Sequence, residues 1–157
     1  MERVAAATHI PPPVPADGEW AAWVRWANQL PSFAEIGLRC EEVGPGHTLA
    51  RLDGSLFTPN PNGAVNGGLV LSAADQCMGL VALTRLDAGA LPVTATVSAE
   101  FLRPAFPALT FRARVSQRGR NLVFVTVEVE DGQGRPCVRC SGAMAAQSSE
   151  RHVRAAG

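Results

Sequence analysis

The central sequence of this chain is Asn60-Pro61-Asn62-Gly63-Ala64-Val65-Asn66-Gly67-Gly68, which precedes an apolar run from Leu69 to about Leu86. Two glycines after an asparagine, ahead of a run without proline, predict a close-approach loop that ends in the first turn of a helix. The free N–H groups at such a helix start attract partial negative charge. We therefore expect the backbone at Gly67 and Gly68 to face such a charge.

The run after these glycines is apolar on almost every face, so its helix should be enclosed by the rest of the fold. Asp75 is the exception in this run. A carboxylate in apolar surroundings must be paired, hydrogen-bonded or shifted in pKa, because burial of an unpaired charge is costly. Asp75 is therefore a candidate for chemistry, and the alternative is a structural role on a narrow polar seam with Ser72 and Gln76.

A second helix is expected near the N-terminus. Asp17 can cap it, its body runs over about 19–30, and Pro31 ends it. Its apolar stripe consists of Trp20, Trp23, Ala27 and Leu30. Three tryptophans on one helix could form a stacking platform, but a stripe packed on the edge of a sheet is the commoner arrangement.

Alternation of apolar and polar residues predicts strands through most of the remaining chain. Gly44-Pro45-Gly46 turns a hairpin within about 36–53, and four strand-like runs follow the central helix at about 93–101, 109–116, 123–130 and 137–147. The expected fold class is α+β, with one long enclosed helix against an antiparallel sheet whose last four strands form a meander.

The 157 residues fit one domain with a core of sufficient size. We expect a flexible arm over residues 1–16, the domain over 17–148 and a frayed tail over 149–157. The formal net charge of +0 argues against a nucleic-acid partner. The sequence contains no apolar core of a signal peptide and no run long enough to span a bilayer, so we expect a cytoplasmic protein without a membrane partner.

Residue usage excludes several kinds of chemistry. All 14 basic residues are Arg, which rules out mechanisms that need a Schiff-base or P-loop lysine. His9, His47 and His152 fall in the arm, a turn and the tail, so a histidine-dependent mechanism is not expected. The four cysteines are Cys40, Cys77, Cys137 and Cys140, and we expect buried thiols rather than a zinc site or any other metal site.

A group of arginines marks a possible anion site. The segment from Phe101 to Val127 contains no Asp or Glu but several arginines. Arg112 and Arg114 are expected on the solvent face of a strand. Arg103, beside Pro104, and the loop residues Arg118 and Arg120 are better candidates for phosphate binding, since loops at strand ends can converge on a ligand.

The central sequence resembles that of the hot-dog-fold acyl-CoA thioesterases of the phenylacetate-pathway (PaaI-like) type. Their pattern is Asn, then His-Gly-Gly six residues on, then Asp or Glu nine residues after that His. Asn60, Asn66-Gly67-Gly68 and Asp75 hold these places. Downstream, Thr94 lies where related enzymes carry Ser or Thr, and Phe101-Leu102-Arg103-Pro104-Ala105 resembles the family strand that ends in Pro-Ala. The similarity runs from about Phe33 to Gln147.

The resemblance implies a hot-dog fold that hydrolyses acyl-CoA thioesters without a cofactor, coenzyme A being part of the substrate. It implies that the Gly67 N–H polarises the thioester carbonyl and that Asp75 activates water or attacks directly. Thr94 and Asn60 would hold the water or the carboxylate, and Gly68 with Arg103, Arg118 and Arg120 would bind substrate.

The resemblance further implies at least a homodimer, and more specifically a homotetramer, in which Gly67 and Asp75 of one chain serve different sites. Asn66 departs from the family pattern, where His is usual. An Asn amide can donate a hydrogen bond but cannot titrate. The sequence therefore leaves two functions open: thioester hydrolysis that depends on Asp75, or a non-catalytic module that binds acyl-CoA.

Overall fold

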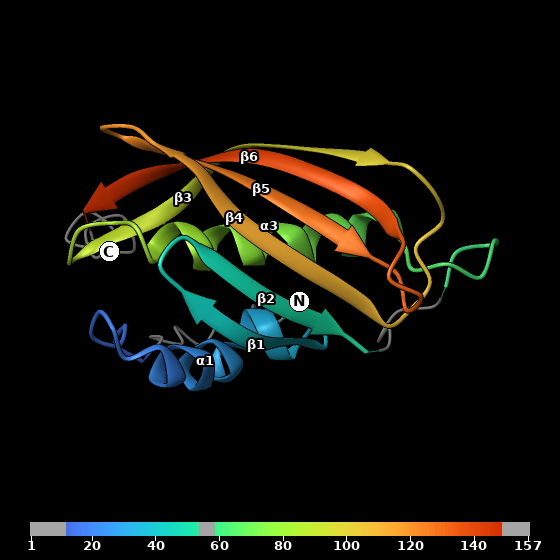
Figure 1. Ribbon diagram of the computed structural model, residues 1–157, viewed down its shortest axis with the longest axis horizontal. Helices are drawn as coiled ribbons and strands as arrows, with labels where there is room; N and C mark the ends of the chain where they lie inside the picture. The colour runs from blue at the N-terminus through green and yellow to red at the C-terminus, as the bar shows by residue number, and fades with distance from the viewer. Residues whose placement is uncertain (1–11, 54–58, 149–157) are drawn as a thin grey trace, which may run out of the picture.

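The computed structural model describes residues 12–53 and 59–148 (Figure 1). The N-terminal part contains two helices and a hairpin: α1 (Trp20–Gln29), α2 (Pro31–Ala34), β1 (Leu38–Gly44) and β2 (His47–Leu52). A long helix and the remaining strands follow: α3 (Gly67–Leu83), β3 (Ala90–Phe101), β4 (Leu109–Arg118), β5 (Leu122–Glu130) and β6 (Pro136–Ser148). This composition confirms the expected α+β class.

The strands form one six-stranded sheet in the order β1-β2-β4-β5-β6-β3, and every neighbouring pair is antiparallel. The predicted meander of the last four strands is wrong, because β3 does not pair with β4. It pairs with β6, where Thr96 lies opposite Ala143 and Phe101 lies opposite Val138. As a result β1 and β3 are the two edges of the sheet.

The sheet curves around α3, which lies along its inner face (Figure 1). This position explains why α3 is apolar on nearly all sides: Val70, Ala73, Cys77 and Val81 are all inaccessible to solvent. The close packing also needs Gly142 on β6, since a Cβ there would lie 2.6 Å from the Thr96 carbonyl oxygen and 2.9 Å from the Met78 sulfur.

The ends of the helices differ from the predicted ones by a few residues. α3 begins at Gly67 rather than Leu69 and ends at Leu83 rather than Leu86. The N-cap of α1 is Glu19 and not Asp17, and no side chain caps its N–H groups. Pro31 does follow the end of α1, but it also opens α2, because the fixed φ of proline suits the first turn of a helix.

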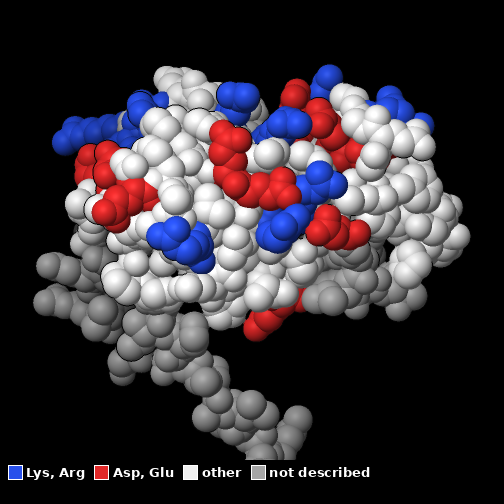
Figure 2. All heavy atoms as spheres, turned by 60° about the horizontal axis from the view of Figure 1, so that its bottom comes forward, with Lys and Arg blue, Asp and Glu red and all other residues white. Residues whose placement is uncertain are grey.

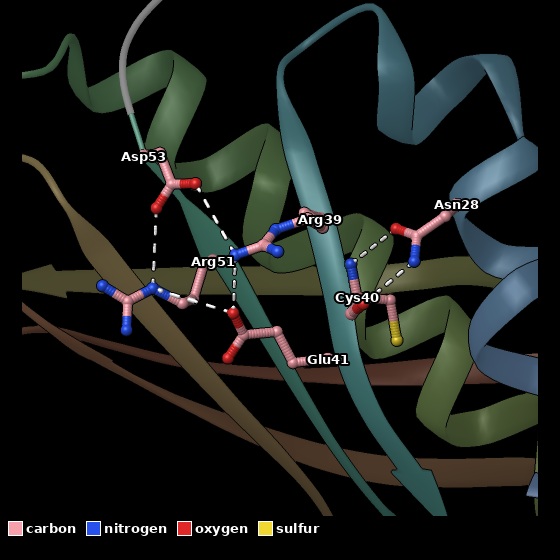
Figure 3. Close-up of polar contacts among 6 residues, drawn as sticks. All are labelled: Asn28, Arg39, Cys40, Glu41, Arg51 and Asp53. Carbon is pink, nitrogen blue, oxygen red and sulfur yellow. Dashed lines mark hydrogen bonds and ion pairs between the residues drawn. The ribbon is translucent and has the colours of Figure 1, made fainter. Parts of the chain in front are cut away.

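Helix α1 packs against the edge strand β1, and Trp23 and Ala27 are buried there. Asn28 secures the contact with two hydrogen bonds to the backbone of Cys40 (Figure 3). Its Nδ2 donates to the Cys40 carbonyl oxygen at 2.9 Å, and its Oδ1 accepts from the Cys40 N–H at 2.8 Å. The side-chain amide thus takes the place of a neighbouring strand at this point of the edge.

The segment that leads into α1 lies against the tryptophans. The Trp23 indole N–H donates to the Ala16 carbonyl oxygen at 3.0 Å, and the Trp26 indole N–H donates to that of Pro12 at 2.8 Å. These contacts concern residues 12–16 of the predicted arm. Its first part, residues 1–11, and the predicted tail, 149–157, lie outside the described residues.

Charged side chains of both signs are interspersed over the face in Figure 2, without a large area of one sign. On the exposed side of β1 and β2 the charges pair: Arg39 lies 2.9 Å from Glu41, and Arg51 lies 3.6 Å from Asp53 (Figure 3). Such a face offers little to a polyanion. In the parts of the chain that the structure describes, no helix combines the length and the apolar character needed to cross a membrane.

Candidate active site

The loop before α3 is held together by the side chain of Asn60. Its Oδ1 accepts hydrogen bonds from the N–H groups of Asn62 at 3.0 Å and Ala64 at 3.1 Å. The Asn60 backbone N–H in turn donates to the Ala64 carbonyl oxygen, and the Val65 N–H donates to that of Ala105. Asn60 therefore orders the approach to the helix start.

Asn66 is the N-cap of α3, and its Oδ1 accepts a hydrogen bond from the Gly68 N–H at 2.8 Å. Asparagine is among the preferred residues at this position. A Cβ on Gly68 would lie 3.0 Å from the same oxygen, so the glycine leaves room for the cap. The Nδ2 of Asn66 has no acceptor among the described residues and can still donate to a ligand.

The Gly67 N–H at the first position of α3 has no acceptor in residues 12–53 and 59–148. It belongs to the helix N-terminus, where the macrodipole favours negative charge. A Cβ on Gly67 would lie 3.2 Å from the ring of Phe101, so the end of β3 runs close beside this turn. Phe101 is itself 52% exposed. The free N–H and the aromatic ring thus lie together near the open edge of the sheet.

Asp75 lies two turns further along α3, and Thr94 of β3 contacts it. The Thr94 hydroxyl donates a hydrogen bond to the Asp75 Oδ1 at 2.8 Å. Asp75 is half-buried, which differs from the expected full enclosure, because it lies where α3 approaches the edge strand β3. Of the other two members of the proposed polar seam, Ser72 is exposed and Gln76 is half-buried. The structure brings together the carboxylate and the hydroxyl that the sequence singled out.

Asp75 and Thr94 line a cavity of about 310 Å³ between the N-terminal helices, α3 and β3. Gln76 is the other polar residue in its wall. Apolar side chains from several elements make up most of the rest, namely Trp26, Leu30, Phe33, Leu80, Leu83, Leu91, Pro92 and Met144. The sequence did not predict that these residues form the wall of a pocket, although it placed Leu30 on the apolar stripe of the first helix. A pocket of this kind suits an apolar group next to a reacting centre.

Gly67 and Asp75 are too far apart to act on one atom within a single chain. Eight residues separate them on α3, and a rise of about 1.5 Å per residue gives roughly 12 Å along the axis. A free backbone donor and a hydrogen-bonded carboxylate therefore lie at two different places on the same protomer. A site that uses both groups needs two chains.

The three candidate arginines also occupy different places. Arg103 is exposed just after β3, at the end of the molecule where α3 begins. Arg118 and Arg120 lie at the opposite end, in and beside the β4–β5 turn (Figure 1). The Arg118 guanidinium donates to the carbonyl oxygens of Arg85 at 2.8 Å and Gly119 at 2.6 Å, so it holds together two parts of the fold. Arg103 and Arg120 carry no such bond among the described residues.

The four cysteines are free and buried, as predicted. Burial raises the pKa of the Cys40 and Cys140 thiols to about 11 and raises the pKa of Cys77 further. Burial likewise raises the pKa of Cys137, whose thiol donates to the Val129 carbonyl oxygen. Neutral buried thiols are poor nucleophiles and metal ligands. Within the described ranges, no three His, Cys, Asp or Glu residues are grouped to hold a metal ion.

Comparison with known proteins finds a family whose model matches the central part of this chain. The family model of the thioesterase superfamily matches residues 62–138, which include the helix start, Asp75, Thr94 and strands β3 to β5. A protein of Saccharolobus solfataricus, named as a candidate esterase, is 34% identical over 74 residues. The match covers 46% of this chain and 52% of that protein, so the chain spans about half the length of the curated relative.

Solved structures have the same fold at lower identity. A thioesterase family protein from Silicibacter pomeroyi superposes with a TM-score of 0.74 at 24% identity, over 82% of this chain and 98% of the other. The E. coli PaaI protein from the phenylacetic acid degradation operon gives 0.70 at 19%, over 77% and 87%. A hypothetical thioesterase from Streptococcus pneumoniae, solved with coenzyme A, gives 0.63 at 22%, over 71% and 86%. The chain therefore has the hot-dog fold of these solved structures, and its central part, residues 62–138, is similar to the thioesterase superfamily.

Proposed function

We propose that this protein hydrolyses an acyl-CoA thioester, with Asp75 as the catalytic carboxylate. The observation that carries the proposal is the hydrogen bond of 2.8 Å between Thr94 and Asp75 in the wall of an apolar cavity. The cavity suits an acyl group, and the carboxylate beside it is the group that can act as base or nucleophile. The Streptococcus pneumoniae neighbour, solved with coenzyme A, supports this substrate class.

In the reaction, the oxygen of a water molecule bonds to the thioester carbonyl carbon, and the carbon–sulfur bond then breaks. Asp75 takes a proton from that water and then donates it to the departing sulfur, so the products are a carboxylic acid and the coenzyme A thiol and the Asp75 carboxylate is restored. In the alternative path, an Asp75 oxygen attacks first and water then hydrolyses the mixed anhydride. Thr94 orients the carboxylate in both paths. A single turnover in heavy-oxygen water that places the label in Asp75 supports the second path, since water must then have attacked the Asp75 carboxyl carbon of the anhydride.

The carbonyl oxygen gains negative charge as either attack proceeds. The Gly67 N–H at the helix start is suited to accept that charge, since it is free and lies at the positive end of the helix dipole. Asn66 can add a second donor through its Nδ2 without any change of protonation. Asn60 supports both groups by holding the loop that leads to them.

Two copies of the chain would complete the site by pairing their β3 strands. β3 is an open edge of twelve residues, and the exposed side chains of Phe101, Leu102 and Phe106 lie at or just after its end. An antiparallel pair related by a twofold axis near Thr96 places the Phe101 end of one strand beside the Leu91–Thr94 end of the other. Gly67 of one protomer, which lies next to Phe101, then comes close to Asp75 of the partner.

We expect the nucleotide part of coenzyme A to contact Arg103. This arginine is exposed at the same end of the chain as Gly67, and a guanidinium is well suited to bind phosphate. Arg120 is exposed in the β4–β5 turn and is retained as a second candidate. Arg118 and Gly68 also remain predictions as substrate ligands, although their described bonds stabilise the fold and the Asn66 cap.

The decisive experiment is a panel of acyl-CoA esters assayed for released thiol. We expect the parent protein to turn over at least one ester, and Asp75→Asn to lower kcat by roughly a hundredfold to ten-thousandfold. Thr94→Val should lower kcat by a smaller factor of about ten, since it loses one hydrogen bond to a charged group, and Thr94→Ser should restore it. Each variant should melt at nearly the parental temperature.

Two results would contradict the proposal. Near-parental turnover by Asp75→Asn would remove the carboxylate from the mechanism. A parent that binds acyl-CoA in calorimetry but releases no thiol from any ester would favour the non-catalytic binding module. Asn66, which stands in place of the family His, is the feature that makes this second function worth testing.

A further inference from the structure

Gly79 occupies an unusual place on the wall of the cavity described above. It lies four residues after Asp75, so both residues are on the same face of α3, one turn apart. Its φ is not in the left-handed region, and a Cβ built on it meets no atom of residues 12–53 and 59–148 within 4 Å. Neither backbone conformation nor a crowded neighbour therefore requires glycine here.

Two other glycines of the chain differ from Gly79 in this respect, because a Cβ on either would meet a close neighbour. A Cβ on Gly142 would lie 2.6 Å from a backbone oxygen, and one on Gly68 would lie 3.0 Å from the Asn66 cap. Glycine is needed at these two positions because a side chain would collide with its neighbours. Gly79 instead lowers the stability of its helix relative to alanine and gains no contact in return. What its missing side chain provides is open space in the cavity.

The wall around this space indicates what can fill it. Apart from Asp75, Gln76 and Thr94, the described residues that line the cavity are apolar or glycine, and none of them is Arg or His. Among these described residues the only ionisable group is therefore an acid, which would repel a carboxylate on the acyl group. The volume of about 310 Å³ is roughly twice that of an apolar cavity that takes up benzene, about 150 Å³.

We propose that Gly79 is the specificity-determining residue of this pocket, and that the pocket accepts an uncharged apolar acyl group of roughly six to ten carbons. The inference rests on the proposed thioesterase function and adds the substrate class to it. The acyl chain lies against Gly79, with its carbonyl carbon one helical turn away at Asp75. A side chain at position 79 would occupy the place of the distal carbons of the acyl group.

The test compares the parent with Gly79→Ala and Gly79→Leu on acetyl-CoA, hexanoyl-CoA, octanoyl-CoA and succinyl-CoA. The parent should prefer hexanoyl-CoA or octanoyl-CoA over the other two. In Gly79→Leu, the ratio of kcat/KM for octanoyl-CoA to that for acetyl-CoA should fall at least about tenfold, because each methylene kept out of the apolar pocket forfeits a factor of about four. Gly79→Ala should shift the ratio less and should raise the melting temperature.

Ala21→Leu is the matched control, since Ala21 is an exposed helical position of α1 outside the cavity wall. It should leave the ratio at the parental value. An active parent whose ratio is the same in Gly79→Leu would overturn the role of Gly79, and a parent that prefers succinyl-CoA would overturn the substrate class. Both results leave the thioesterase function standing.

If the parent hydrolyses neither these esters nor any other ester of the panel, the proposed function fails and the pocket is tested by binding alone. Calorimetry with octanoyl-CoA should then give a Kd at least about tenfold weaker for Gly79→Leu than for the parent. Equal Kd values would overturn the assignment of Gly79, whatever the activity.

Discussion

Asp131 is a buried acid in the turn between β5 and β6. Its carboxylate accepts hydrogen bonds from two residues of that turn, Gln133 and Arg135. Oδ1 accepts from the N–H groups of Gln133 at 2.9 Å and Arg135 at 3.0 Å, and Oδ2 lies 2.7 Å from the Arg135 guanidinium. The side-chain hydrogen bond from Arg135, followed by that residue's backbone N–H, holds the pKa of Asp131 below its usual value. The folded state therefore binds a proton at Asp131 more weakly than the unfolded chain does.

This difference predicts how stability depends on pH. A lowered pKa contributes stability that is fully present above the unfolded value of about 3.9 and is lost as the pH falls through the folded value. Asp131→Asn should thus lower the melting temperature at pH 7, and the difference from the parent should shrink below about pH 4. Asp17→Asn, at an exposed acid without an ion pair in the described chain, is the control. A difference between parent and Asp131→Asn that stays constant down to pH 2 would contradict this account.

At single residues, the sequence indicated which groups the candidate site brings together better than it indicated their surroundings. The spacing of Asn66, Gly67 and Asp75 identified the helix start and the carboxylate, and the resemblance added Thr94. The sequence did not indicate a role for Gly79. A glycine in an apolar helix can be interpreted only when the structure shows the space beside it. The bonds of Arg118 to Arg85 and Gly119 were equally hidden, since they depend on how the β4–β5 turn packs against the end of α3.

Among the elements, α1 is held on the edge strand β1 by the side chain of Asn28 in addition to its buried apolar residues. Asn28→Ala would leave both backbone groups of Cys40 without a partner from α1, so we expect the free energy of unfolding to fall by roughly 1–3 kcal/mol. The neighbouring exposed Gln29 makes no side-chain bond to the described residues, and Gln29→Ala should change stability by less than about 0.5 kcal/mol. Urea unfolding measures both variants. Equal midpoints for the two would show that the amide does not hold α1 on β1.

Strands and helices were predictable in kind but not in their partners. The alternation of Val123, Val125, Val127 and Val129 marks one buried face, and these residues are indeed buried in β5. Alternation reports which face a residue occupies, and it carries no information about which strand lies alongside. The pairing of β3 with β6 could therefore not be predicted from the sequence. The two strands are about 50 residues apart, and they pair through backbone N–H and C=O groups, which are the same in every sequence.

For the whole molecule, the outer face of the sheet carries an alternating row of charges across four strands. Glu100 of β3, Arg139 of β6, Glu128 of β5 and Arg112 of β4 are register partners and are exposed around a hollow of about 450 Å³. Within the sheet each of these charges lies beside one of the opposite sign, and Arg112 also lies 3.4 Å from Glu130. Cross-strand pairs of this kind stabilise the pairing of the four strands.

The central claim is that each active site combines Gly67 of one chain with Asp75 of its partner, and a mixing experiment tests it most directly. Asp75→Asn and Gly67→Val should each be inactive, the second because its side chain would meet the Phe101 ring and mask the N–H. In a mixed dimer one site collects both changes and the other has neither. Random exchange of subunits at equal amounts should therefore restore roughly a quarter of the parental kcat per site. Activity that stays at zero while mass spectrometry shows mixed dimers would contradict the composite site.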